Sequence, residues 1–398
     1  IWDLATGTAV TTLAGHTGGV FTVAYSLDGS HLASAGIDGT VRIWDLATGT
    51  AVTTLAGHTG GVFTVAYSPD GTHLVSTGQD GVRLWDPATG TSVATLTGHT
   101  GGVQAVAYSP DGTHLASASD DGTVRIWDLA TCTAGTTLTG HTGGVQAVAY
   151  SPDGTHLAGA ALDGTVRVWD LAAGIAVTTL SAHTRWLEAV AYSPDGTHLA
   201  SAGSEVRIWD LATASAVTTL TGHAGGVQAV AYSPDGTHLA SAARDGVRIW
   251  NLATGTAVTT LTSQAGGVQA VAYSPDGTHL ASTDWGGVRI WDLATATTLA
   301  TLTGHTGWVQ AVAYHPGGTH LASAGRDGTM RIWDLATGAC VRSHGVVATD
   351  SLGGGGVAVW DPRIDQILHA TGDAWRCLAW LPRGTTDWSR AEPIECSP

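Results

Sequence analysis

The chain has 398 residues, of which 43% are hydrophobic and only 12% charged, so apolar residues for a globular core are plentiful. Its 16 basic residues are all Arg and are outnumbered by 32 acidic residues, which gives a formal net charge of −16. Such a charge repels phosphate groups and argues against general binding to nucleic acid or to anionic membranes. Protonation of the 18 His would nearly cancel this charge, so charge-dependent behaviour should change steeply between about pH 7 and pH 5.

Cysteine usage and the chain ends indicate the cellular compartment. The four Cys are widely spaced and form no Cys-x-x-Cys pair, which favours free thiols in a reducing compartment. The sequence contains no run of about 18 apolar residues and no signal-peptide pattern. It begins at Ile1, inside a motif, and its one Met is Met330. We therefore expect a cytoplasmic location, no membrane contact, and a chain that is a piece of a longer protein.

A Trp followed by Asp or Asn recurs along the first 340 residues or so at intervals of 40 to 42 residues. The text between successive Trp residues is nearly constant, so the chain is an internal repeat. Eight full repeats begin at residues 15, 57, 98, 140, 182, 222, 263 and 304. Residues 1–14 precede the first repeat and match the end of another one.

Repeat three, residues 98–139, shows the expected secondary structure. Residues 103–108 form a β-rich run, and Ser109-Pro110-Asp111-Gly112 is typical of a tight turn. Residues 113–117 and 123–127 predict a second and a third strand, and a Thr-rich fourth strand follows. Helical periodicity is absent. A four-stranded antiparallel unit cannot bury both of its faces alone, so neighbouring repeats must stack.

This period, with Gly-His near the start of a repeat and Trp-Asp near its end, resembles the WD40 family, whose repeats form β-propeller blades. The resemblance covers residues 1–342 and implies an all-β propeller with eight blades of four antiparallel strands. Residues 8–13 would supply the outer strand of the last blade and close the ring. Residues 343–398 resemble a degenerate partial repeat with a tail, which could instead form a ninth, incomplete blade or cap an edge.

Each WD40 blade typically carries a hydrogen-bonded tetrad of His, Ser or Thr, Asp and Trp. By resemblance, five repeats have the complete tetrad: His16, Ser34, Asp38 and Trp44; His58, Ser76, Asp80 and Trp85; His99, Ser117, Asp121 and Trp127; His223, Ser241, Asp245 and Trp250; His305, Ser323, Asp327 and Trp333. Repeat four has Gly159 in place of Ser. Repeat five has Gly203-Ser204-Glu205 at the Asp turn, and repeat seven has Gln264 for His and Gly286 for Asp. We expect these three blades to be held less firmly.

Ser, His and Asp together also suggest a catalytic triad. Because the set recurs in five repeats beside a Trp, a structural role is the better interpretation, and we expect no enzyme activity. A second set of His begins the second strand of every repeat, but its copies lie too far apart to share a metal ion. Without Lys there is no phosphate-binding Gly-x-x-x-x-Gly-Lys loop. The sequence thus predicts no cofactor and no metal.

Positions that differ between the repeats are where binding specificity can lie. They fall just after the tetrad His and just before the tetrad Asp, and in WD40 proteins both line the mouth of the central channel. Trp and Arg dominate binding hot spots. The predicted partner-binding residues are Arg185, Trp186 and Glu188 in repeat five, Arg244 in repeat six, Trp285 in repeat seven, Trp308, Gln310 and Arg326 in repeat eight, and Phe21 and Phe63 in repeats one and two.

The leading hypothesis is a protein–protein interaction scaffold, or a recruitment or sensor platform in signalling, that binds peptide segments at the channel mouth. Bacterial WD40 arrays with near-identical repeats resemble this chain and often follow a kinase or signalling ATPase domain, which we would expect upstream. The absence of Lys fits a GC-rich genome. Two alternatives are a propeller that binds a small molecule or acts as an enzyme, and a recently expanded array with little selected binding.

Overall fold

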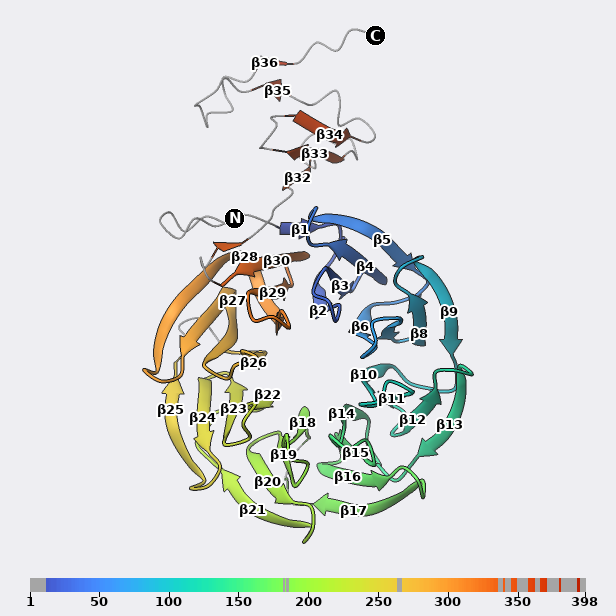
Figure 1. The fold of residues 1–398 in the computed structure, drawn as a ribbon, viewed down its shortest axis with the longest axis vertical. Helices are drawn as coiled ribbons and strands as arrows, with labels where there is room; N and C mark the ends of the chain where they lie inside the picture. The colour runs from blue at the N-terminus through green and yellow to red at the C-terminus, as the bar shows by residue number, and fades with distance from the viewer. Residues whose placement is uncertain are drawn as a thin grey trace. The chain divides into compact units, whose positions relative to one another are not determined.

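Figure 1 shows the fold in a computed structural model of the chain. The structure describes residues 12–181, 183, 186–262 and 267–335, together with short strands between residues 339 and 393. All of the described regular elements are β-strands. No helix among these residues is long and apolar enough to cross a membrane.

Repeat one shows how each blade is built. β2 (Val20–Tyr25), β3 (His31–Gly36), β4 (Thr40–Asp45) and β5 (Thr50–Ala56) pair antiparallel in chain order. β2 lies nearest the centre of the ring and β5 at its rim (Figure 1). The turn before β3 places Gly29 at φ +69°, a left-handed conformation that glycine adopts without steric cost. Strands and turns therefore form where the repeat pattern predicts them.

Five further four-stranded sheets follow in the same order. Their strands are β6 (Val62–Tyr67), β7 (Leu74–Gly78), β8 (Gly81–Asp86) and β9 (Thr91–Leu96); β10 (Val103–Tyr108), β11 (His114–Ser119), β12 (Val124–Asp128) and β13 (Thr133–Leu138); β14 (Val145–Tyr150), β15 (His156–Ala161), β16 (Thr165–Asp170) and β17 (Ile175–Ser181); β18 (Ala189–Tyr192), β19 (His198–Ala202), β20 (Val206–Asp210) and β21 (Ser215–Leu220); β22 (Val227–Tyr232), β23 (His238–Ala243), β24 (Gly246–Asn251) and β25 (Thr256–Leu261).

The prediction of eight separate four-stranded blades is wrong, because the described strands of the ring form seven blades. The seventh, which we call the double blade, is one continuous seven-stranded sheet that holds the strands of both repeats seven and eight. It consists of β26 (Val271–Tyr273), β27 (His279–Asp292), β28 (Thr297–Tyr314), β29 (His320–Gly325) and β30 (Thr329–Asp334), with β1 (Thr12–Ala14) and β31 (Ala339–Cys340).

The double blade arises because β28 does not break between the two repeats. Its first half is the outer strand of repeat seven, and its second half is the inner strand of repeat eight. The pair of Trp285 with Trp308 continues the pairing of β27 with β28 beyond Gly287 and Thr303, whereas repeats one and four end this ladder at the equivalent pairs Thr40 with Ala56 and Thr165 with Ser181. Gly286, at φ +82°, stands at the position where complete repeats have the tetrad Asp. This departure from the repeat pattern coincides with the fusion.

The ring closes by joining the two ends of the repeat array. β1 pairs antiparallel with β30, with Leu13 opposite Met330, and β31 pairs with the far end of β30. The outer strand of repeat eight is thus assembled from residues that precede repeat one and from residues near the end of repeat eight itself. Of residues 8–13, which were expected in this role, residues 8–11 lie outside the described part of the chain. Pairing of this kind leaves the ring without an open seam.

The core lies between successive repeats. A typical cluster combines Ala33, Ile43 and Leu55 of repeat one with Val62 and Trp85 of repeat two, all almost completely buried. An equivalent cluster joins every adjacent pair of repeats around the ring, including repeats seven and eight inside the double blade. Burial of a large apolar side chain contributes roughly 1.5–3 kcal/mol, so stacking of the repeats, rather than any single blade, holds the ring together.

The chain divides into two compact units, Ile1–Arg342 and Ser343–Pro398. The second contains its own sheets. β32 (Gly345–Ala348), β33 (Val357–Asp361) and β34 (Gln366–Ala370) form one, and β35 (Ala379–Trp380) pairs with β36 (Glu392–Pro393). The sheet of β32 to β34 contains no strand from the ring.

Candidate functional site

A buried chain of hydrogen bonds runs through each complete repeat. In repeat one, the indole N–H of Trp44 donates to Ser34 Oγ at 2.9 Å, and Ser34 Oγ lies 2.8 Å from His16 Nε2. His16 Nδ1 lies 3.0 Å from Asp38 Oδ1. Because the Asp38 carboxylate can only accept, a neutral His16 donates to it from Nδ1, and its Nε2 then accepts from the Ser34 hydroxyl, whose oxygen accepts the Trp44 N–H. Every polar group of the tetrad is thereby satisfied.

The same contacts are present in the other repeats whose sequence has all four residue types. His99 lies 2.7 Å from Ser117 and 2.9 Å from Asp121. In repeats two, six and eight, the corresponding His also bonds both its Ser and its Asp, and the Trp donates to the Ser. The tetrad links the segment before the first strand to the second and third strands of its blade.

Burial sets the protonation state of the tetrads. Desolvation lowers the pKa of His16, although its hydrogen bond to Asp38 opposes this effect. Desolvation would raise the pKa of Asp38, but hydrogen bonds from His16 and from the Thr17 N–H outweigh it and lower that pKa. Each tetrad at neutral pH therefore holds a neutral imidazole against an ionised carboxylate.

Repeats four and five, which depart from the pattern, contain buried His or Trp nitrogen atoms without partners. In repeat four, Gly159 leaves both His141 Nε2 and Trp169 Nε1 without a hydrogen bond. The ring centroids of His141 and Trp169 are 5.6 Å apart, whereas those of His99 and Trp127 are 6.3 Å apart. The indole of repeat four thus lies closer to its imidazole, in the space that Ser occupies elsewhere.

Repeats five and seven lack different members of the tetrad, and their remaining members are bonded differently. His183 bonds Ser201 at 2.6 Å, but its Nδ1 has no partner, and burial lowers its pKa from 6.5 to about 4. In repeat seven, Trp291 donates to Ser282, and Asp284 forms an ion pair with Arg289 at 3.3 Å. Gln264, which stands in place of the His, lies outside the described residues.

The hydrogen-bonded series of Ser, His and Asp has the residue types of a catalytic triad, but its burial does not suit catalysis. Ser34 is completely buried, and its oxygen already accepts the Trp44 N–H. A nucleophile must reach its substrate, and no group from solvent can approach this oxygen. Within the described part of the chain, no three or more His, Cys, Asp or Glu side chains gather in a way that could hold a metal ion.

The accessible candidate site is one end of the ring, which we call the mouth end. In a four-stranded antiparallel blade, the turn between the second and third strands and the link to the next blade lie at the same end. The residue before the tetrad Asp is exposed there in most repeats, including Ile37, Arg244 and Arg326. Trp186 and Trp285 are each 53% exposed, which is unusual for the largest apolar side chain.

The structure brings two of the predicted Trp residues together. The rings of Trp285 and Trp308 meet edge to face with centroids 5.5 Å apart. The backbone N–H of Arg326 donates to the carbonyl oxygen of Trp308 at 2.8 Å. The exposed Arg326 therefore lies in a turn beside Trp308. Trp186, in repeat five, makes no ring contact with either Trp within the described residues. Arg185 lies outside the described residues.

The other predicted residues line the mouth at the first strand. Glu188 in repeat five and Gln310 in repeat eight occupy equivalent positions, and both are half-buried. Desolvation raises the pKa of Glu188. Phe21 and Phe63 occupy the same position in repeats one and two, with ring centroids 6.1 Å apart. Gln104 and Gln146 occupy it in repeats three and four, and both amides donate to Asp120.

Ring closure makes repeats eight and one neighbours. A side chain built at Gly19 of repeat one would meet the backbone of Arg326 of repeat eight at 3.4 Å. Ile37, which is 57% exposed, lies against Gly61 of repeat two. The consecutive repeats seven, eight, one and two therefore carry the aromatic residues Trp285, Trp308, Phe21 and Phe63, whereas repeats three and four carry Gln104 and Gln146 at the first-strand position. Reasoning along the chain missed this continuity, although a closed ring implies it.

Comparison with known protein families gives one clear result. The model of the family described as WD40, WD domain, G-beta repeat, matches eight segments: residues 7–45, 49–86, 90–128, 132–170, 174–210, 214–251, 255–292 and 296–334. Together these segments make up most of the chain. A comparison with curated proteins gives no match.

Proposed function

Because the chain belongs to the WD40 family, a fold commonly used for protein–protein interaction, we propose that it is a scaffold that binds peptide segments of partner proteins at the channel mouth. The contact between Trp285 and Trp308 carries this proposal. Two large aromatic rings held together at an exposed position bury much area on contact with a partner and lose little conformational freedom.

Charge suggests the character of the bound segment. The exposed Arg244 and Arg326 occupy turns at the mouth end, Arg326 beside Trp308, and we propose that Arg185 and Trp186 extend the same surface. A segment that combines apolar side chains with carboxylates would satisfy both features, because guanidinium groups pair well with carboxylates. The part of the segment that enters the channel would then contact Phe21, Phe63, Glu188 and Gln310.

The biological setting is a further part of the proposal. A cytoplasmic platform that recruits proteins in signalling, linked to an upstream kinase or signalling ATPase domain of a bacterial protein, fits a chain made almost entirely of repeats. The neighbouring coding sequence tests this part directly. An upstream nucleotide-binding or kinase domain in the same reading frame would support it, and an unrelated flanking sequence would contradict it.

Affinity capture from a lysate of the source cell tests the binding function. The chain is compared with a variant in which Trp186, Trp285 and Trp308 are changed to Ala. A control variant carries Val93→Ala, Val217→Ala and Val258→Ala, which removes exposed apolar side chains from the rim instead. Proteins retained by the chain and the control but lost by the Trp variant would support the proposal. Identical capture by all three would contradict it.

A further inference from the structure

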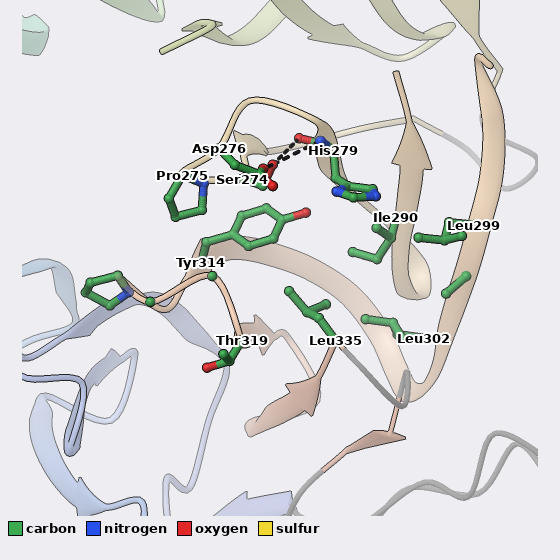
Figure 2. Close-up of a pocket in the computed structure, with 14 residues that line it drawn as sticks. Ser274, Pro275, Asp276, His279, Ile290, Leu299, Leu302, Tyr314, Thr319 and Leu335 are labelled. Carbon is green, nitrogen blue, oxygen red and sulfur yellow. Dashed lines mark hydrogen bonds between the residues drawn. The ribbon is translucent and has the colours of Figure 1, made fainter. Parts of the chain in front are cut away.

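A cleft between successive repeats opens at the end of the ring opposite the mouth. Figure 2 shows the one between repeats seven and eight, where Ile290, Leu299 and Leu302 face Tyr314 and Leu335 across a volume of about 640 Å³. Equivalent clefts of about 420, 490 and 920 Å³ lie between repeats one and two, three and four, and four and five. Volumes of this size are typical of ligand pockets.

The largest cleft, between repeats four and five, has an apolar wall. Val168 and Val177 come from the third and fourth strands of repeat four, and Tyr192 and Leu211 come from repeat five. Val177 is 50% exposed, so the wall continues to the rim of the ring. An aliphatic chain could lie along this surface with its own apolar area buried.

Three carboxylates line the same cleft. The hydrogen bonds that Asp153 and Asp195 accept from the Ser and Thr of their turns all end on Oδ1. Those that Asp210 accepts from Thr213 also end on Oδ1. Within the described residues, Oδ2 of each carboxylate is thus left for an external donor. The hydrogen bonds from Ser151 and Ser193 hold the pKa of Asp153 and Asp195 at about 2, so both are ionised at neutral pH.

Positive charge is absent from the lining. Among the described residues, no Arg lines any of these four clefts. The Arg of the third strand points elsewhere: Arg167 of repeat four donates to Thr179, and Arg207 of repeat five pairs with Glu205 at the mouth end. Among the residues that the structure describes, the carboxylates of the cleft therefore have no Arg partner from the third strands of their own repeats.

We propose that the cleft between repeats four and five binds an arginine side chain of a basic polypeptide segment. The aliphatic part of the arginine lies against Val168 and Val177, and its guanidinium group donates to the free oxygens of Asp153, Asp195 and Asp210. A planar guanidinium can bond two carboxylates at once, which a lysine ammonium does less well. The similar cleft nearby, lined by Asp111, Asp128 and Asp153, would bind a further arginine of the same segment, because the hydrogen bonds to Asp111 and Asp128 also end on Oδ1.

The chain contains its own comparison site. In repeat eight, Gly317 stands where the other repeats have the turn Asp, so the cleft of Figure 2 is lined by one carboxylate, Asp276. It has a similar apolar wall but lacks the two further carboxylates that line the larger cleft. We expect it to bind arginine more weakly, and Gly317→Asp to strengthen binding there.

The test uses a labelled oligo-arginine peptide, an oligo-lysine peptide of the same length, and a triple variant with Asp153→Asn, Asp195→Asn and Asp210→Asn. Asn keeps the Oδ1 acceptor, as Asn251 shows at the position equivalent to Asp210. The control variant, Asp120→Asn, Glu188→Gln and Glu205→Gln, removes the same charge from the mouth end. Fluorescence anisotropy measures affinity, and hydrogen–deuterium exchange locates the bound peptide.

We expect the arginine peptide to bind more tightly than the lysine peptide and to protect residues 151–156 and 193–198 from exchange. The triple variant should bind about tenfold more weakly and lose this protection, while the control keeps both. Gly317→Asp should add protection at residues 315–320, which remains informative if the triple variant unfolds. Equal weakening in the triple variant and the control, or protection confined to the mouth end, would overturn the proposal.

Discussion

Trp285 and Trp308 face each other across the pairing of β27 with β28, and their rings meet edge to face. The same pair that fuses repeats seven and eight into one sheet also presents an aromatic surface at the channel mouth. Structure and proposed function are thus linked at one position. A change at either Trp side chain should therefore affect binding through the ring, whereas the backbone pairing of the sheet can persist.

Trp285→Ala should weaken binding of a mouth partner by about 2 kcal/mol, because an exposed aromatic ring in a hot spot contributes about that much. The melting temperature should change little, since the ring is half exposed and its backbone pairing can persist. Isothermal titration with a captured partner and thermal unfolding of both proteins check the two parts. A large loss of stability with unchanged affinity would assign the ring a purely structural role.

Charge reversal at the mouth should weaken binding of the partner. Arg185→Glu, Arg244→Glu and Arg326→Glu together should reduce affinity by about tenfold or more at low salt, and the loss should shrink as salt increases. Titrations at two ionic strengths measure this effect. If affinity does not change, the bound segment is not acidic, although binding at the aromatic residues could still hold.

Gly159→Ser should stabilise the chain, by about 1 kcal/mol, because a Ser oxygen would satisfy both His141 Nε2 and Trp169 Nε1. A Cβ at Gly159 would lie 2.8 Å from the Trp169 ring, so the indole must move away from His141, toward the separation seen in repeat three. Thermal unfolding measures the change.

The reciprocal variant, Ser117→Gly in repeat three, provides the control. It should destabilise the chain by about 2 kcal/mol, since it leaves His99 and Trp127 without the shared oxygen. If Gly159→Ser lowers the melting temperature instead, repeat four has repacked around its glycine, and the tetrad can no longer form there.

Stability should fall as the pH drops below about 6.5. Burial lowers the pKa of His183 from 6.5 to about 4, and it also lowers the pKa of each tetrad His. The unfolded chain therefore binds protons that the folded chain does not, and stability is lost as the pH falls from about 6.5 toward 4. Melting temperatures measured between pH 8 and pH 4 check this. A profile that stays flat to pH 4.5 would show that the imidazoles titrate normally in the fold.

The repeat predicted most of the fold because each blade has the same local signals: a β-rich run, a turn with Gly at positive φ, and a Trp that packs on the next repeat. The number of separate blades could not be predicted in this way. It depends on whether pairing continues past Trp285 and Trp308, and small differences in one turn decide that. The sequence gives no direct sign of such a continuation, beyond the loss of the tetrad His and Asp in repeat seven.

The candidate site was predicted in part. Residue type and position placed the Trp and Arg residues at one end of the ring, because variable positions in a repeat fall in its turns. Their mutual contacts depend on the three-dimensional path of the ring. Trp285 meets Trp308, whereas Trp186 belongs to another repeat of the mouth, and Gly19 lies against the backbone of Arg326 only because the ring closes between repeats eight and one. The clefts at the opposite end are formed by the stacking of repeats and have no counterpart in a single repeat.

The most direct test of the proposed function is hydrogen–deuterium exchange of the chain with and without a partner recovered by affinity capture. We predict protection at the mouth, in residues 284–287 and 305–309 of the double blade and in residues 18–21 and 60–63 of repeats one and two. The outer strands, such as β9 and β25, should exchange at the same rate in both states. Protection confined to the outer strands or to the end opposite the mouth would contradict the proposal that the aromatic mouth is the binding site.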